Sequence, residues 1–220
     1  LARTRAALDS VGAEYDLLSE KQSLHGALDA YPDAVVPYAP NLSAAGRAAL
    51  RTYCHDGGEV MCFYTTYGLE SELGLLGTTY VSGADRSLFA YVRCERSALP
   101  GLPDGFAQSS WNIRAPDPAP ETRVLATWLN AERQETGYAA ATLSGGGFYF
   151  SHVLVAEGDE ALRGAGRMLV AAADYLAARR GERRQLAIVY GTASESNSGD
   201  GRLVGDMVGE MESILAEAGL

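Results

Sequence analysis

Two short apolar segments, 34–36 and 59–65, lie on either side of a segment with helical periodicity, and this order limits the folds open to the chain. The first segment runs into Pro37 and Pro40, which end it in a rigid loop. The segment 44–55 follows a serine that can cap a helix. The second apolar segment has no polar face, which is typical of a strand buried on both sides of a parallel sheet. The order strand, helix, strand predicts an α/β fold.

The rest of the chain predicts more strands and several helices. Residues 77–123 contain β-prone stretches between Gly, Pro and Ser residues, and we expect them to form a β-rich insertion. Further strand-like segments are 123–130, 137–143, 148–155 and 186–190. Segments with helical periodicity are 1–18, 69–76, 160–179 and 203–218. The predicted fold is therefore α/β, a flavodoxin-like three-layer sandwich with a mainly parallel sheet and a β-rich insertion.

The two ends of the chain resemble each other. The terminal segment 208–220 aligns loosely with 1–13, although two amphipathic helices can match by chance. A doubly wound domain normally begins with a strand, whereas this chain begins with a helix and carries a strand, loop and helix at 184–220. We interpret 1–220 as a single domain cut in a shifted frame. In this interpretation strand 186–190 takes a central place, either within its own molecule or swapped into a neighbour.

Four segments together resemble class I glutamine amidotransferase-like domains. They are 32–64, 108–116, 123–130 and 144–176, and the resemblance covers about 14–178. The similarity is greatest to versions found beside bacterial glycosyl hydrolases, of the family-10-like and trimerisation-domain types, and in trehalose-utilisation-like proteins. It implies the fold predicted above and a glycine turn followed by an aromatic strand that ends near a histidine.

The residues that a glutaminase of this family needs are not in place. Such an enzyme carries its cysteine on a sharp strand-to-helix elbow, where strain and a helix N-terminus lower the thiol pKa. Here the elbow reads TTYG at 65–68, and Cys62 lies inside the preceding strand. A catalytic histidine also needs an orienting acceptor, but no carboxylate follows His152 two residues later. Glutamine hydrolysis is therefore not expected.

Several side chains are candidates for a binding site at the carboxyl edge of the sheet, where open α/β folds bind ligands. Hydroxyls and aromatic rings suit a sugar, because rings stack on aromatic faces and sugar hydroxyls need paired donors and acceptors. The candidate ligand-binding residues are Tyr64, Thr65, Thr66, Tyr67, Glu70, Trp111, Asn112 and His152. His152 is also the candidate catalytic residue. The alternative for each is structural: helix capping and loop packing at the elbow, Trp111 filling the insertion, and His152 packed among aromatic rings.

Charge and composition limit the classes of binding partner that we expect for the chain. The chain has 18 basic and 28 acidic side chains, a net charge of −10, and nucleic-acid binding needs clustered Lys and Arg instead. No apolar run has the roughly 18–20 residues of a membrane span, and no signal peptide is evident. We therefore expect neither nucleic acid nor membrane as a partner, and we favour a bacterial cytoplasmic location. Three cysteines without ligand spacing predict no metal site, and no cofactor motif is present.

Three functions stay open. The leading one is a non-catalytic accessory module of a bacterial carbohydrate-active protein, which binds glycan or mediates assembly with other parts of its parent chain. The first alternative is a hydrolase acting on a sugar or related small polar substrate. Glycosidase chemistry needs two carboxyls roughly 5–10 Å apart, and the spacing of the acidic residues singles out no pair. The second alternative is homo-oligomerisation through the helix at 160–179.

Overall fold

The computed structural model describes residues 1–83 and 86–191 of the chain. Its helices are α1 (Ala2–Asp9), α2 (Glu20–Leu24), the short 3₁₀ helix η1 (Ala27–Ala30), α3 (Ala44–His55) and α4 (Asp159–Arg180). Residues at the ends of the two longest helices, α3 and α4, explain where these helices begin and end. The Ser43 hydroxyl accepts a hydrogen bond from the Gly46 amide at the start of α3. Helix α4 ends at Gly181, whose positive φ of 71° suits the glycine that follows many helices.

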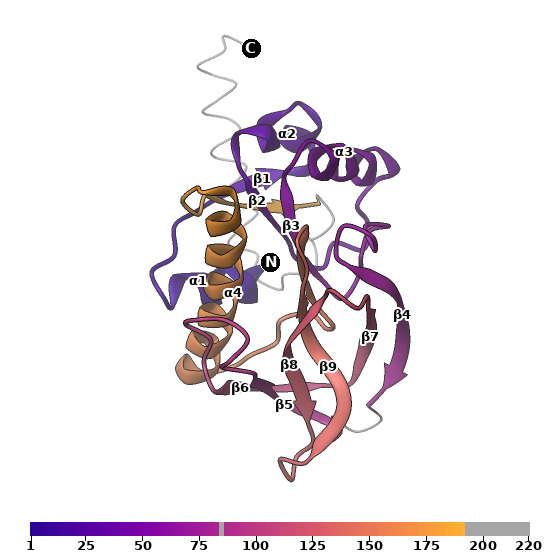
Figure 1. Cartoon of the computed structure of the whole chain (residues 1–220), viewed down its shortest axis with the longest axis vertical. Helices are drawn as coiled ribbons and strands as arrows, with labels where there is room; N and C mark the ends of the chain where they lie inside the picture. Colours follow the sequence, from indigo (N-terminus) through magenta and orange to yellow (C-terminus); the bar gives the residue numbers. More distant parts are fainter. Residues whose placement is uncertain (84–85, 192–220) are drawn as a thin grey trace, which may run out of the picture.

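The strands form one large sheet and a separate two-stranded ribbon (Figure 1). They are β1 (Tyr15–Ser19), β2 (Asp33–Val36), β3 (Glu59–Phe63), β4 (Leu75–Ser82), β5 (Phe89–Cys94), β6 (Gly105–Ser110), β7 (Asn112–Pro118), β8 (Arg123–Leu129), β9 (Glu135–Leu143), β10 (Gly147–Phe150) and β11 (Leu186–Tyr190). The large sheet has nine strands in the order β1-β11-β2-β3-β10-β9-β8-β5-β6, and β4 pairs with β7 in the ribbon.

The strands from β1 to β10 in this order are parallel, and all of them except the edge strand β1 are buried along their whole length. Alternate side chains point to opposite sides, so Val35 and Met61 join the core beneath α1 and α4, whereas Val36 and Cys62 face the core beneath α2 and α3. Figure 1 shows α4 and α1 together on one side of the sheet and α2 and α3 near the other end. Burial on both faces explains why the sequences of β2, β3, β10 and β11 are almost entirely apolar.

The predicted flavodoxin-like three-layer sandwich with a mainly parallel sheet is wrong. Four of the eight pairings in the nine-stranded sheet are antiparallel, because β9, β8, β5 and β6 extend it beyond β10. The segment predicted as an insertion thus supplies β5 and β6 to the main sheet, and it also supplies β7 and most of β4 to the separate ribbon. Burial alternates along β6, so one face of this strand is exposed to solvent, as is common in antiparallel sheets.

Smaller corrections concern element ends. The predicted helix at 69–76 is replaced by turns that lead into β4, and the predicted helix at 1–18 ends at Asp9. The strand predicted at 148–155 ends at Phe150, so His152 lies on a loop. The predicted helix at 203–218 lies outside the described residues.

Strand β11 occupies the interior of the sheet in its own chain. It pairs in parallel with β1 on one side and with β2 on the other. Strand β11 therefore lies second from the edge of the sheet, and the swapped alternative for 186–190 stays a prediction. The interpretation of the chain as a domain in a shifted frame stays a prediction.

Helices α1 and α4 pack so closely that we expect Gly166→Ala to destabilise the protein by about 1–3 kcal/mol. A methyl group on Gly166 would overlap the backbone carbonyl of Ala7, which has no freedom to move aside. In Gly46→Ala the added methyl meets only the end of the Glu20 side chain, so we expect a change of less than about 1 kcal/mol. Urea unfolding of both variants checks this, and equal losses would contradict it.

Candidate functional site

The carboxyl ends of β2, β3 and β10 meet at one edge of the sheet and bring aromatic side chains together. Tyr38 follows β2, Tyr64 follows β3 directly, and His152 follows β10. The chain leaves β2 toward α3 on one face, whereas it leaves β10 toward α4 on the other. β3 lies between these two strands, and such a change of direction along a parallel sheet opens a crevice where α/β proteins bind ligands.

Tyr64 is held in a strained conformation at this edge. Its φ of 65° lies in the left-handed region, which costs a non-glycine residue roughly 1–2 kcal/mol. The Tyr64 amide donates to the carbonyl of Phe150 at 2.8 Å, and the Tyr149 hydroxyl lies 3.0 Å from the Tyr64 carbonyl. The surrounding structure therefore fixes the direction of the Tyr64 ring.

The rings form a continuous row with Tyr64 near its middle. Ring centroids are 4.9 Å apart for Trp111 and His152, 5.7 Å for His152 and Tyr64, and 5.3 Å for Tyr64 and Tyr38. All three contacts are edge-to-face, a geometry that aromatic quadrupoles favour. The structure thus joins three predicted residues, Tyr64, Trp111 and His152.

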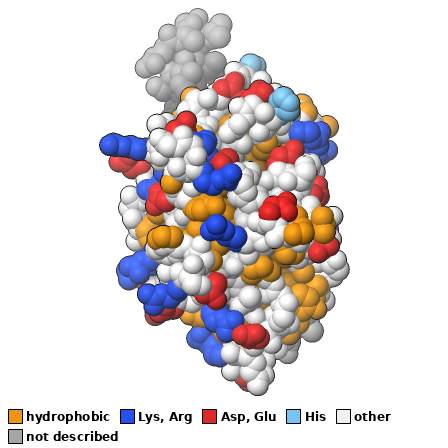
Figure 2. Space-filling model, in the orientation of Figure 1, with side chains coloured by type: hydrophobic (Ala, Val, Ile, Leu, Met, Phe, Trp, Pro, Cys, Tyr) orange, Lys and Arg blue, Asp and Glu red, His pale blue; other side chains and the backbone are white. Residues whose placement is uncertain are grey.

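A cavity of about 220 Å³ opens beside this row. It is lined by Tyr38, Ala39, Pro40, Leu42, Arg47, Tyr64, Thr65, Tyr67 and Arg114. The guanidinium of Arg114, on β7, lies 5.9 Å from the centre of the Tyr64 ring. Across the β4–β7 ribbon Arg114 is paired with Tyr80, whose side chain is 56% exposed. Figure 2 shows hydrophobic side chains gathered along the side where Figure 1 draws β4.

Tyr67 and Thr66 support the cavity in different ways. The Tyr67 hydroxyl accepts from the Ala39 amide at 2.8 Å and donates to the Pro37 carbonyl at 2.9 Å, so it joins the two loops that line the cavity. The Thr66 hydroxyl donates to Glu70 at 2.5 Å. Neither Thr66 nor Glu70 lines the cavity, so their place in the predicted site is structural.

His152 is positioned as a buried neutral ring. Its side chain is 1% exposed, and Nδ1 donates to the Val153 carbonyl at 2.9 Å, which leaves Nε2 as the acceptor nitrogen. The His152 pKa is lowered to about 4, chiefly by burial, while the Val153 hydrogen bond opposes this shift and the nearby Arg86 charge adds to it. Gln108 holds the same loop, because its amide nitrogen donates to the Val153 carbonyl at 3.0 Å. This arrangement favours a packing role over proton transfer.

The cysteines lack the setting of a nucleophile. Burial raises the pKa of Cys62 well above its usual value and raises the pKa of Cys54 to about 12, so both are thiols at neutral pH. The strained position directly after β3 holds Tyr64 instead of a cysteine. Within 1–83 and 86–191 no group of three or more His, Cys, Asp or Glu side chains could hold a metal ion.

Sequence reasoning predicted three of the nine residues that line the cavity, Tyr64, Thr65 and Tyr67. Asn112 is buried in β7, its Oδ1 has no hydrogen-bond partner among the described residues, and it does not line the cavity. Tyr38, Arg47 and Arg114 were not predicted. The proline-bounded loop after β2 was a usable signal for Tyr38. The sequence around Arg114 did not indicate a binding residue, because only the packing of the β4–β7 ribbon brings Arg114 to the sheet edge.

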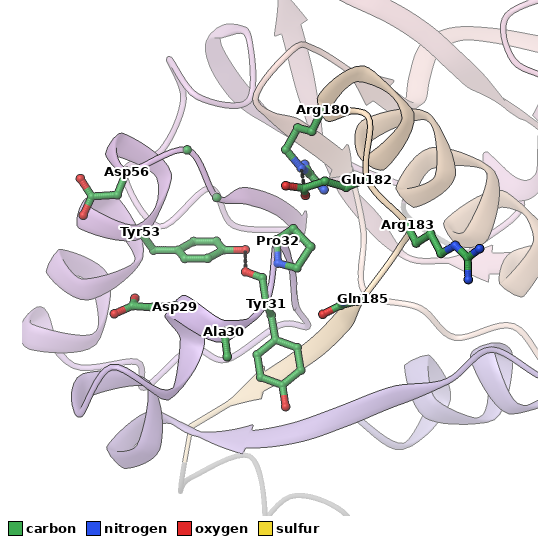
Figure 3. A pocket seen from close by; sticks show the side chains of 12 residues that line it. Asp29, Ala30, Tyr31, Pro32, Tyr53, Asp56, Arg180, Glu182, Arg183 and Gln185 are labelled. Atoms are coloured by element: carbon green, nitrogen blue, oxygen red, sulfur yellow. Dashed lines mark hydrogen bonds and ion pairs between the residues drawn. The ribbon is translucent and has the colours of Figure 1, made fainter.

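A larger cavity, of about 820 Å³, lies at the opposite, amino-terminal edge of the parallel strands (Figure 3). Several of its polar groups are already paired within the chain. Arg180 contacts Glu182, Asp33 and Glu59, and the Tyr53 hydroxyl donates to the Tyr31 carbonyl at 2.9 Å. Ligands of α/β sheets bind at the carboxyl edge, so the smaller cavity is the candidate site.

Fold and cavity define an α/β protein with a mixed sheet and a polar, aromatic site at the carboxyl edge of its parallel half. The cytoplasmic protein STM1381 from Salmonella typhimurium LT2 shares this fold with a TM-score of 0.50 and 10% identity, over 78% of this chain and 84% of that one. The cytoplasmic protein STM3548 from Salmonella typhimurium matches with a TM-score of 0.46 and 9% identity, over 69% and 74% of the two chains.

A protein described as ThuA-like, from Bacteroides uniformis ATCC 8492, matches with a TM-score of 0.42 and 16% identity, over 72% of this chain and 74% of that one. A ThuA-like protein is thus among the structural neighbours, and the association with glycosyl hydrolases stays a prediction. No protein-family model and no curated protein matches the sequence. Among the helices of the described ranges, none is both long and apolar enough to cross a membrane.

Proposed function

We propose that the protein is a non-catalytic binding module for a carbohydrate of about one sugar ring. The observation that carries the proposal is the cavity lined by Tyr38, Tyr64 and Thr65 at the carboxyl edge of the parallel strands. Its volume of about 220 Å³ is below the roughly 300–1,000 Å³ of pockets that bury drug-sized ligands. A single ring with hydroxyl groups fits this size.

The side chains at the cavity suit the two surfaces of a sugar. The Tyr38 ring is 39% exposed, so it can offer an aromatic face to the apolar side of the ring. The hydroxyl of Thr65 and the guanidinium groups of Arg47 and Arg114 are donors for ring hydroxyls. The rigid frame made by Tyr67 and Tyr149 means that little side-chain order has to be created on binding.

The same geometry supports binding rather than turnover. His152 is buried behind Tyr64 and faces a backbone carbonyl instead of a carboxylate. The Glu70 carboxylate accepts from Thr66 and does not line the cavity. Helix α4, predicted as an oligomerisation surface, directs Met168, Leu169 and the other apolar side chains of one face into the core of its own chain.

Calorimetric titration with neutral monosaccharides and their derivatives tests the proposal, with Tyr38→Ala beside the wild type. Loss of one aromatic contact should weaken binding by roughly 0.5–1.5 kcal/mol, about two- to tenfold. At 100 times its dissociation constant a ligand should stabilise the protein by about 2.7 kcal/mol. Leu76→Ala is the control, since Leu76 is 70% exposed on the same ribbon and does not line the cavity. Equal binding by wild type and Tyr38→Ala would contradict the proposed site.

A further inference from the structure

We infer that the ligand carries an anionic group, a carboxylate or a phosphate attached to a sugar, and that Arg47 and Arg114 bind this group. The inference rests on the proposed function, because it names the class of carbohydrate that the same cavity takes. Its basis is the charge of the cavity, which is independent of the aromatic contacts that carry the proposed function.

The cavity has the opposite charge from the chain as a whole. The protein has a net charge of −10, yet the cavity is lined by Arg47 and Arg114 and by no acidic residue among those described. On the face that Figure 2 shows, Lys and Arg side chains are interspersed with Asp and Glu. Two arginines without a carboxylate between them therefore form a local positive potential, which attracts an anion.

Neither guanidinium is neutralised within the described part of the chain. Arg47 donates through Nη1 to the Leu42 carbonyl at 2.6 Å, which uses one of its five N–H groups. Arg114 lies over the Tyr64 ring, and no carboxylate of residues 1–83 or 86–191 forms an ion pair with it or with Arg47. By contrast, Arg93, Arg96 and Arg180 each contact a carboxylate. Arg47 and Arg114 thus keep donors for a ligand.

The start of helix α3 does not supply the anion site. The Ser43 hydroxyl already accepts from the Gly46 amide at 3.0 Å, and the Glu20 carboxylate accepts from the Ser43 amide at 2.9 Å. These contacts occupy the first turn of α3, so the guanidinium groups are the donors that face the cavity. Arginine presents a planar fork that matches the oxygen atoms of carboxylate and phosphate, and such charged hydrogen bonds are stronger than neutral ones.

The test compares neutral and anionic forms of the same sugars by calorimetry at low salt. The probes are glucose and galactose, their uronic acids, their 6-phosphates, and inorganic phosphate. We expect at least one anionic form to bind about tenfold or more tightly than its neutral parent, with affinity falling as salt is raised. Comparison of uronic acid with 6-phosphate identifies carboxylate or phosphate as the preferred group.

Arg114→Gln should weaken binding of the anionic form by about tenfold more than binding of its neutral parent, so that the preference for the anion is lost. The matched control is Arg163→Gln, which makes the same charge change at an exposed position on α4 in a different cavity. Equal affinity for neutral and anionic sugars would overturn the inference and leave the proposed function standing. Inorganic phosphate binding as tightly as the sugar phosphates would support the anion site and overturn the sugar. No binding of any probe would overturn both.

Discussion

Replacing Arg180 with methionine should lower the free energy of unfolding by about 3–5 kcal/mol, the largest effect that we expect from a single charged side chain. Arg180 lies at the last turn of α4 and contacts Asp33 and Glu59, which are the first residues of β2 and β3. Asp33 is fully buried and Glu59 is nearly so. Without the guanidinium, two carboxylates would be left buried and close together, and urea unfolding at neutral pH should detect the loss.

Two further variants separate this effect from a general loss of packing. Burial raises the pKa of Asp33 above its usual value, and the Arg180 charge offsets that rise only in part. Asp33→Asn should therefore recover part of the loss in the Arg180→Met background, which a double-mutant cycle measures. Arg179→Met is the matched control, because Arg179 is exposed, and we expect less than about 1 kcal/mol there. If Arg180→Met also lowered the free energy of unfolding by less than about 1 kcal/mol, the prediction would be contradicted.

Acidification should destabilise the protein through His152 by on the order of 3 kcal/mol. The His152 pKa is lowered by burial to about 4, whereas an unfolded histidine titrates near 6.5. Between these values the unfolded chain takes up a proton that the folded protein does not, so stability falls as pH falls. The contribution is complete above about pH 6.5 and is lost by about pH 4.

Unfolding curves at steps between neutral pH and about pH 4.5 measure this effect in the wild type and in His152→Gln. The variant should show a flatter dependence of the free energy of unfolding on pH in this range, whatever its absolute stability. His55→Gln is the control for the loss of a histidine, because His55 is an exposed residue at the end of α3. Parallel curves for the wild type and His152→Gln would show that the slope comes from other groups.

Local patterns in the sequence predicted most elements but not their assembly. The segment 44–55 agrees with α3, and 160–179 agrees with α4 to within one residue at each end. Apolar runs identify a doubly buried strand because both faces must be apolar. They do not show which strand comes next in the sheet. Whether β9 pairs with β10 or forms a separate insertion depends on contacts between segments, and no local pattern records them.

The residues of the candidate site were likewise predictable only where local sequence patterns place them. Tyr64, Thr65 and Tyr67 could be predicted because they follow a buried strand, and the carboxyl edge of such strands is a known place for ligands. Arg47 and Arg114 could not, because arginine on a helix or on a ribbon is usually a solvated surface residue. Asn112 was predicted from its polar neighbours, yet it is buried at the start of β7, whereas Arg114, two residues later, is exposed.

The position of β11 sets an order on the synthesis of the chain. β1 has its ladder partner in β11, more than 160 residues later, so a ribosome-bound chain cannot seat its first strand until Tyr190 has left the exit tunnel. Until then β2 presents the edge that β11 will cover. Sequence-distant pairing of this kind folds slowly and leaves strands exposed to other chains. Emerging chains of this protein should therefore depend on holding chaperones more than a protein whose neighbouring strands follow one another in sequence.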